Sequence, residues 1–347
     1  MKKLIGAAAV GALLALLPSA AQAQDPPGGR PPTASITVDG PTTWPNWGQQ
    51  ATEWSPPREG RIAEDWVYGN RFDNPDHVIW NEAKRRMNAG LDVQSFTASR
   101  GWTPERYCGL AKLGYDFAFV NIQHQALDVW QVADMYACNG NAPIPAIQGP
   151  GNTFYSHGAR IPDSSERWIQ SILDAGAMTL VVPTVDTEAE AEEIVHWALF
   201  PPLGARSSGG GLINSLYGNV PGGYRNSFND NIVIIAMIET LEGVENAYEI
   251  ASVPGIDAVF AASGDLGNFS GYSEGNEAYE WLIQRVVDAA VAAGKPVCGP
   301  DDWHPARSKD NPVRVAQNFT CFQGGSNPTE DLAERIAAGE VPAPPAP

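Results

Sequence analysis

Basic residues are scarce in this sequence. Lysine and arginine total 22 against 40 aspartate and glutamate residues, which gives a formal net charge of −18. A surface this acidic repels nucleic acid and anionic lipid, so we expect neither as a partner. A small anionic substrate is still compatible with this charge, because a few buried cations can dominate the field inside a pocket.

Long apolar runs are missing after the N-terminus. Beyond residue 23 the sequence has no stretch of about 18 uninterrupted apolar residues, which argues against a transmembrane helix there. Two lysines, the apolar run Leu4–Leu17 and the small residues of Ala21-Gln22-Ala23 have the pattern of a secretory signal over residues 1–23. We expect cleavage after Ala23 and a periplasmic or secreted protein. The alternative is an N-terminal membrane anchor that is retained uncut.

Cysteines are few, and none forms a Cys-x-x-Cys pair, which argues against a zinc ribbon. The four are Cys108, Cys138, Cys298 and Cys321. Export would permit disulfides, and four cysteines allow three pairings. Buried free thiols are the alternative.

Two segments lack helical or strand periodicity. Residues 24–76 form a lead rich in proline, glycine and tryptophan, and the tail 341–347 is largely proline and alanine. We expect irregular structure in both. Trp44, Trp47 and Trp54 indicate that part of the lead packs on the folded body, because tryptophan is costly to leave in water.

Short apolar runs alternate with amphipathic segments over residues 77–340. The expected strands are 91–97, 116–120, 144–148, 179–183, 232–238, 258–261, 296–298 and 319–322. The expected helices are 104–112, 126–137, 164–175, 188–197, 243–251, 279–293 and 328–338. This alternation predicts parallel βαβ units, and eight of them favour an α/β fold of the (β/α)8 TIM-barrel type. The alternative is a doubly wound open sheet, but the glycine-rich turn typical of its first strand is absent from FTASRGWTPER.

A barrel of this kind also favours one set of disulfides. Cys298 and Cys321 would lie on the adjacent seventh and eighth strands, which run about 4.8 Å apart. Cys108 and Cys138 would lie near the ends of adjacent outer helices. We therefore expect the pairs Cys108–Cys138 and Cys298–Cys321.

Two acidic residues follow the fifth and sixth expected strands. Glu239 ends the run IVIIAMIET, and Asp265 comes just after DAVFAAS. The carboxyl ends of barrel strands carry the chemistry, so both side chains are expected at the barrel mouth. Two carboxylates suit a hard cation such as Mg²⁺ or Mn²⁺ and leave positions open for substrate. The alternative is that Glu239 caps the next helix and Asp265 belongs to an ordinary turn.

A histidine and two arginines are further candidates. His124 follows the second strand and could transfer protons near neutral pH. Arg160 precedes an amphipathic helix and could hold a carboxylate or enolate oxygen in two hydrogen bonds. Arg206 precedes a glycine-rich stretch that could serve as a lid. For each of the three, a surface or purely structural role is the alternative.

Three segments together resemble the HpcH/HpaI aldolase family, also called the aldolase/citrate lyase family. They are ARIP followed ten residues later by LDAGAMTLVVPTV, then FPPLGARSSGG, then AMIETLEGVENAYEIASVPGIDAVFAASGDLG. Their order and spacing match, and the resemblance covers roughly residues 80–340.

The resemblance implies a (β/α)8 barrel, assembled as a homo-trimer or hexamer, that makes or breaks a carbon–carbon bond through a pyruvate-like enolate. It places Glu239 and Asp265 on the two ligands of a divalent cation, with Mg²⁺ or Mn²⁺ expected first and Co²⁺ as a further candidate. It places Arg160 on the arginine that steadies the enolate oxygen and His124 on the acid–base histidine. It places Asp174 on an aspartate that reaches a neighbouring subunit's site in some members.

The sequence departs from the family pattern at several positions near the expected site. The usual Asp-Gly-Glu-His reads Asn121-Ile122-Gln123-His124, and an asparagine cannot balance an imidazolium, so a lower basicity of His124 is expected. Met237 replaces a glutamine, and Ala262-Ser263-Gly264-Asp265 replaces Gly-Pro-Ala-Asp. The expected substrate-binding residues are therefore Arg160, Asn121, Gln123, Met237, Ser263 and Gly264. The stretch GPGNTFYSHG resembles an insertion and is expected to reshape the mouth.

Three functions are compatible with these patterns. The first is a divalent-metal-dependent carbon–carbon lyase of the aldolase type that acts on a 2-oxo acid or a related hydroxy-carbonyl compound. In this enzyme His124, or a water on the metal, takes the hydroxyl proton. The second keeps the enolate but acts as a hydratase, a decarboxylase or a condensation enzyme. The third is an exported small-molecule binder without turnover, which the changes at Asn121 and Met237 would permit.

Overall fold

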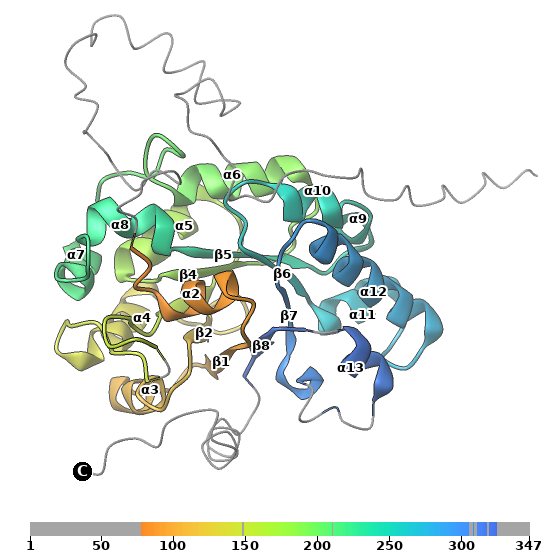
Figure 1. Cartoon of the computed structure of the whole chain (residues 1–347), viewed down its shortest axis with the longest axis horizontal. Helices are drawn as coiled ribbons and strands as arrows, with labels where there is room; N and C mark the ends of the chain where they lie inside the picture. The colour runs from red at the N-terminus through yellow and green to blue at the C-terminus, as the bar shows by residue number, and fades with distance from the viewer. Residues whose placement is uncertain are drawn as a thin grey trace, which may run out of the picture.

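The computed structural model describes residues 78–147, 149–209, 211–304, 308, 311–317 and 319–324. Eight parallel strands close into a barrel in which each strand pairs with the next and the last pairs with the first (Figure 1). The strands are β1 (Val93–Ala98), β2 (Phe117–Asn121), β3 (Gly158–Arg160), β4 (Thr179–Val182), β5 (Val233–Ile238), β6 (Ala258–Ala261), β7 (Val297–Pro300) and β8 (Cys321–Gln323). The predicted (β/α)8 barrel is confirmed. The predicted signal, lead, final helix and tail lie outside the described residues.

Helices surround the strands on the outside, and one of them, α2, lies across an end of the barrel (Figure 1). They are α2 (Glu82–Asn88), α3 (Pro104–Ala111), α4 (Val129–Tyr136), η4 (Ala137–Asn139), α5 (Glu166–Ala175), α6 (Glu188–Ala198), α7 (Gly211–Tyr217), α8 (Tyr224–Asn231), α9 (Leu241–Glu245), α10 (Ala247–Ser252), α11 (Ser263–Ser270), α12 (Glu277–Ala292), η5 (Asp301–Trp303) and α13 (Pro312–Gln317). Local sequence starts several of them, as at α6, where Thr187 and Glu190 form a reciprocal capping box. In the described part of the chain, no helix has the length and apolar character to cross a bilayer.

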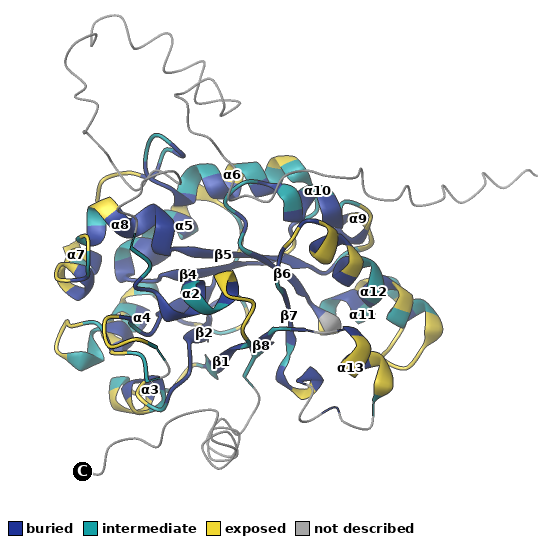
Figure 2. Ribbon diagram, viewed as in Figure 1, coloured by how far each residue is buried: buried dark blue, intermediate teal, exposed yellow. Residues whose placement is uncertain are grey.

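The strands divide the core into two layers because successive side chains point to opposite faces. Along β5, Val233, Ile235 and Met237 belong to the cluster inside the barrel, whereas Ile234 and Ala236 pack outward against the helices. Figure 2 shows the strands almost entirely buried and the exposed residues on helices and loops. The inward alternation along β5 continues to residue 239, which sets the position of the first site carboxylate.

Helix α2 closes the end of the barrel where the strands begin. Ala83 and Met87 join the inner cluster, and the Lys84 ammonium donates to the carbonyl of Ile232 and pairs with Asp257, beside the starts of β5 and β6. Asn81 caps the helix and donates to the carbonyl of Asn231. Because this end is plugged, a substrate can approach the barrel interior from the opposite end, where the strands finish.

The third strand lies elsewhere than predicted. Of the predicted strand 144–148, the described residues 144–147 belong to no named strand, and Pro145 forms an isolated bridge with Phe154, whereas β3 is the three-residue segment Gly158–Arg160. A glycine is needed there because a Cβ on Gly158 would lie 2.5 Å from the carbonyl oxygen of Ala118. The insertion-like stretch therefore precedes β3 and lies beside α2, with the Phe154 N–H donating to the Trp80 carbonyl at 2.7 Å. The expectation that it reshapes the mouth is wrong.

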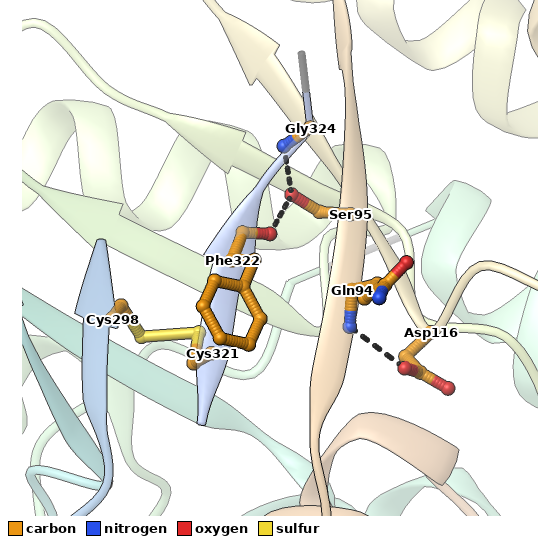
Figure 3. Close-up of a disulfide and its surroundings, with 7 residues drawn as sticks. All are labelled: Gln94, Ser95, Asp116, Cys298, Cys321, Phe322 and Gly324. Carbon is orange, nitrogen blue, oxygen red and sulfur yellow. Dashed lines mark hydrogen bonds between the residues drawn. A yellow bond between two sulfur atoms is a disulfide. The ribbon is translucent and has the colours of Figure 1, made fainter. Parts of the chain in front are cut away.

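Of the two expected disulfides, the structure contains one. Cys298 of β7 and Cys321 of β8 are in register and joined by a disulfide, with their Cα atoms 4.2 Å apart (Figure 3). Both lie in the inner cluster of the barrel. The second expected bond does not form in this structure, because Cys108 and Cys138 are free thiols. Burial, followed by the contact with Cys108, raises the pKa of Cys138, so this thiol is held in its protonated form.

Candidate active site at the barrel mouth

Glu239 lies directly after β5 on its inward face and is the central acidic group of the mouth. The residue is 1% exposed. Its Oε1 accepts two hydrogen bonds from Thr184, one from the backbone N–H and one from the hydroxyl, both at 2.8 Å. Its Oε2 is buried and has no hydrogen-bond partner among the described residues. A buried carboxylate oxygen without a partner is costly, so Oε2 is the atom of Glu239 that is available to a cation.

Asp265 supplies the second carboxylate from the neighbouring strand unit. It is the third residue of α11, which begins just after β6, and β6 pairs with β5 through Ile238 and Ala261. Burial raises the pKa of Glu239, and the charge of Asp265 adds to this rise while Thr184 and Arg160 oppose it. The two acids are therefore close enough to repel each other, and a divalent cation between them would relieve that repulsion.

Arg160 ends β3 and brings a positive charge to the same mouth. It is 8% exposed, its Nε donates to the Asn121 Oδ1 at 3.3 Å, and its guanidinium lies 5.3 Å from the centre of the Phe119 ring. Burial lowers the pKa of this guanidinium, and the charges of Glu239 and Asp265 act in the opposite direction. The structure thus brings together the two predicted metal ligands and the predicted arginine.

The end of β2 connects Arg160 to the predicted histidine. The Asn121 Oδ1 also accepts the backbone N–H of His124 at 3.2 Å, so one amide oxygen orders both the guanidinium and the loop. The His124 residue is exposed, and Gln123 is half-buried with its Oε1 unpaired within the described residues. Asn121 therefore acts as a neutral acceptor at the position where the family pattern has an aspartate.

The floor of the mouth is apolar. Met237 precedes Glu239 by two residues on the same inward face and is paired in register with Phe260, whose ring centre lies 6.1 Å from that of Phe119. The other two predicted substrate-binding residues, Ser263 and Gly264, open α11. Gly264 is exposed, and a Cβ built on it would meet nothing within 4 Å, so space is free above this turn.

The donor set fits a divalent cation that prefers oxygen. No group of three or more His, Cys, Asp or Glu side chains that could hold a metal occurs in the described ranges. Two carboxylates with one orphaned oxygen leave positions open for water and a bidentate substrate, which is the arrangement that Mg²⁺ and Mn²⁺ use at catalytic sites. The histidine and cysteine ligands typical of zinc are not gathered among the residues described at this mouth.

The chain resembles known enzymes in both sequence and fold. The family model for HpcH/HpaI aldolase/citrate lyase matches residues 114–299, more than half of the chain. The chain belongs to this family. A relative, the 4-hydroxy-2-oxovalerate aldolase of Novosphingobium aromaticivorans, is 33% identical over 236 residues, which covers 65% of this chain and 84% of that protein.

Two further comparisons agree with the family assignment. The hydroxypyruvate/pyruvate aldolase of Delftia acidovorans is 40% identical over 196 residues, or 55% of this chain and 67% of that protein. The crystal structure of an HpcH/HpaI aldolase from Desulfitobacterium hafniense superimposes with a TM-score of 0.59 at 23% identity, covering 76% of this chain and 98% of that one. The first comparison shows a relationship in sequence, and the second shows a shared fold.

In this family member, Asp174 lies away from the mouth of its own chain. It sits near the end of α5, which runs back from the end of β3 towards the start of β4, so it lies at the plugged end of the barrel. Its Oδ1 accepts from the Arg206 guanidinium at 2.9 Å. Any contact of Asp174 with a catalytic site would therefore be with that of another subunit, which stays a prediction.

Arg206 is not the base of a lid over this mouth. Its side chain is fully buried, with the guanidinium 4.6 Å from the Phe200 ring centre and 4.2 Å from that of Phe228. The segment between α6 and α7 carries it at the plugged end, on the far side from Glu239. The lid expectation was wrong because helix α6 runs against the strand direction and returns the chain to that end.

The sequence patterns missed Thr184. This residue follows β4 and adopts a φ of +51°, a left-handed conformation that is uncommon for a β-branched residue. It supplies both hydrogen bonds to the Glu239 Oε1. Neither the composition nor the spacing of VVPTVDT distinguishes such a threonine, because the signal lies in its backbone conformation.

Proposed function

We propose that this chain is a divalent-metal-dependent carbon–carbon lyase of the aldolase type, acting on a 2-oxo acid or a related hydroxy-carbonyl compound. The observation that carries the proposal is the buried Oε2 of Glu239, which has no partner among the residues that the structure describes and lies beside Asp265, with Arg160 at the same mouth. The names of the two relatives, both aldolases of 2-oxo acids, support the reaction class.

Glu239 and Asp265 would hold the cation, for which Mg²⁺ and Mn²⁺ are the first candidates and Co²⁺ a further one. When bound, such an ion acts as a Lewis acid on the substrate carbonyl. We also propose export through the signal of residues 1–23 and assembly into a trimer or hexamer.

The chain's own residues would divide the remaining tasks. As the carbon–carbon bond of the substrate breaks, its electron pair moves onto the 2-oxo carbonyl oxygen, and the proton of the 4-hydroxyl leaves. The Arg160 guanidinium, ordered by Asn121, donates hydrogen bonds to the oxygen that gains charge. His124, or a water molecule, takes the hydroxyl proton, so that an aldehyde is released. Protonation of the carbon left behind then gives the free 2-oxo acid. Phe119, Met237 and Phe260 exclude water below this point.

A substrate panel with and without chelator tests the proposal. We expect retro-aldol cleavage of 4-hydroxy-2-oxo acids to yield pyruvate or a close analogue plus an aldehyde, to stop in EDTA and to return with Mn²⁺. Glu239→Gln should lose at least about 100-fold in kcat, because one ligand becomes a neutral amide. Glu242→Gln, an exposed residue of α9, is the matched control and should behave as the wild type. Full turnover in EDTA, or equal activity of the two variants, would refute the proposal.

An enzyme that keeps the enolate but catalyses hydration, decarboxylation or condensation is the second candidate. The neutral Asn121 beside Arg160 and the buried Met237 below Glu239 favour it, because both change the groups next to the reacting atoms. Product analysis separates the two, since a free aldehyde or ketone together with the 2-oxo acid is formed only by the retro-aldol reaction. Loss of CO₂ or of water from the same substrates would favour the second candidate.

A further inference from the structure

We propose that Thr184 is the positioning residue that presents a single oxygen of Glu239 to the cation, an inference that rests on the proposed function. The basis is that both donors of Thr184 converge on Oε1, while Oε2 has no hydrogen-bond partner in the part of the chain that the structure describes. Thr184 itself would touch neither the metal nor the substrate.

The backbone of Thr184 is held in a conformation that threonine rarely adopts. Its φ of +51° lies in the left-handed region, which glycine and asparagine enter far more readily than a β-branched residue. Conformations of this kind persist only where the surroundings fix them, and they gather at functional sites. In this conformation the backbone N–H and the side-chain hydroxyl of one residue reach the same carboxylate oxygen.

The segment that carries Thr184 is clamped onto the end of β5. The N–H of Val185 donates to the Met237 carbonyl at 3.0 Å, just before Glu239. The hydroxyl of Thr240, just after Glu239, donates to the Asp186 carboxylate, and the Asn246 side chain donates to the Asp186 carbonyl at 2.7 Å. These contacts join the turn after β4 to the residues on both sides of Glu239, and so tie the position of Thr184 to that of Glu239.

As a consequence, Oε1 of the Glu239 carboxylate is bonded to Thr184, and Oε2 has no partner among the described residues. Two donors at 2.8 Å fix the rotation of the Glu239 carboxylate, and Glu239 itself is 1% exposed although Thr184 lies at the surface of the mouth. The cation would then meet a preoriented Oε2 and would not have to order the side chain itself. Groups that orient a ligand in this way typically contribute about 10- to 100-fold to metal affinity.

The test is Mn²⁺ binding to the full chain by calorimetry and by electron paramagnetic resonance, for three substitutions of Thr184. Thr184→Val keeps the shape but removes the hydroxyl, and we expect binding about 10- to 100-fold weaker. Thr184→Ser keeps the hydroxyl and should bind within about threefold of the wild type. Thr184→Gly also removes the hydroxyl, but glycine suits the left-handed backbone. We therefore expect Thr184→Gly to lose Mn²⁺ affinity as Thr184→Val does, with a melting temperature at least as high as that of Thr184→Val.

Two controls separate a positioning role from a merely structural one. Thr187→Val removes the N-cap hydroxyl of α6 and should lower the melting temperature while leaving Mn²⁺ affinity unchanged. The double variant Thr184→Val with Glu239→Gln should bind no more weakly than Glu239→Gln alone, because Thr184 acts through Glu239.

The outcomes also distinguish this inference from the proposed function. Wild-type protein that binds Mn²⁺ together with a Thr184→Val variant that binds it equally well would overturn the role of Thr184 and leave the metal site standing. The role of Thr184 would also be overturned if, across all the variants, the loss of Mn²⁺ affinity were proportional to the loss in melting temperature. Wild-type protein that binds no divalent cation would refute the proposed function and this inference together.

Discussion

Replacing Arg160 by methionine should separate catalysis from metal binding. The guanidinium is 8% exposed, is ordered through the Asn121 Oδ1 and lies at the same mouth as the two carboxylates. If it stabilises the oxygen that gains charge, its removal should cost about 100- to 1,000-fold in kcat, or roughly 3–4 kcal/mol of transition-state stabilisation. Arg160→Lys should fall between the wild type and Arg160→Met, because lysine keeps the charge but lacks the planar pair of donors.

The same substitution should leave Mn²⁺ affinity unchanged or slightly increased. The positive charge of Arg160 opposes a cation held nearby, so its loss removes a repulsion. Steady-state kinetics on the best substrate of the panel, followed for each variant at saturating Mn²⁺, gives kcat, and calorimetry gives the metal affinity. An Arg160→Met variant with kcat within about threefold of the wild type, far from the loss expected for an oxyanion donor, would refute the assigned role. A variant that no longer binds Mn²⁺ would do the same.

Three further predictions concern stability and assembly. His157 is fully buried, accepts or donates a 2.8 Å hydrogen bond with Tyr107, and has its pKa lowered by burial to about 3. Between pH 6.5 and about 3 the unfolded chain binds a proton at this histidine that the folded chain does not. The free energy of unfolding should therefore fall by roughly 2–3 kcal/mol from pH 6.5 to 4.5. Urea melts of His157→Phe over the same pH range should lack this decrease. Replacing both Cys298 and Cys321 by alanine removes a link across 23 residues and should lower the free energy of unfolding by about 3 kcal/mol, with a lower melting temperature under non-reducing conditions; equal melting curves would contradict this. If Asp174 serves a neighbouring subunit, Asp174→Asn should lose turnover and recover part of it when mixed with Glu239→Gln subunits, whereas full activity of Asp174→Asn alone would exclude the role.

The fold followed from the sequence wherever a strand was long and apolar. The run before Glu239 and the run before Asp265 fill both faces of β5 and β6 and are therefore apolar throughout. β3 was missed because three residues beginning with glycine contain no apolar run, while the nearby PIPAIQ looks more like a strand. Its glycine is required by the approach of the Ala118 carbonyl, which only the closed barrel creates.

The candidate site was predictable where it depends on strand ends and not where it depends on conformation. Arg160 ends β3, Glu239 directly follows β5, and Asp265 lies in the first turn of α11 just after β6, so the barrel rule alone places all three at the mouth. Thr184 could not be found in this way, because its two hydrogen bonds arise from a left-handed backbone that the sequence does not encode in a recognisable pattern. The position of Asp174 follows from the direction of α5, which returns to the plugged end.

The central claim is that Glu239 and Asp265 jointly hold one divalent cation. A crystal of the wild-type protein soaked in Mn²⁺, measured at a wavelength where manganese scatters anomalously, tests it directly. The account predicts one anomalous peak at the barrel mouth, about 2.2 Å from the Glu239 Oε2 and from an Asp265 carboxylate oxygen, with Oε1 still bonded to Thr184. A fully occupied peak elsewhere with none between the two carboxylates, or the absence of any peak while the two side chains point apart, would contradict it.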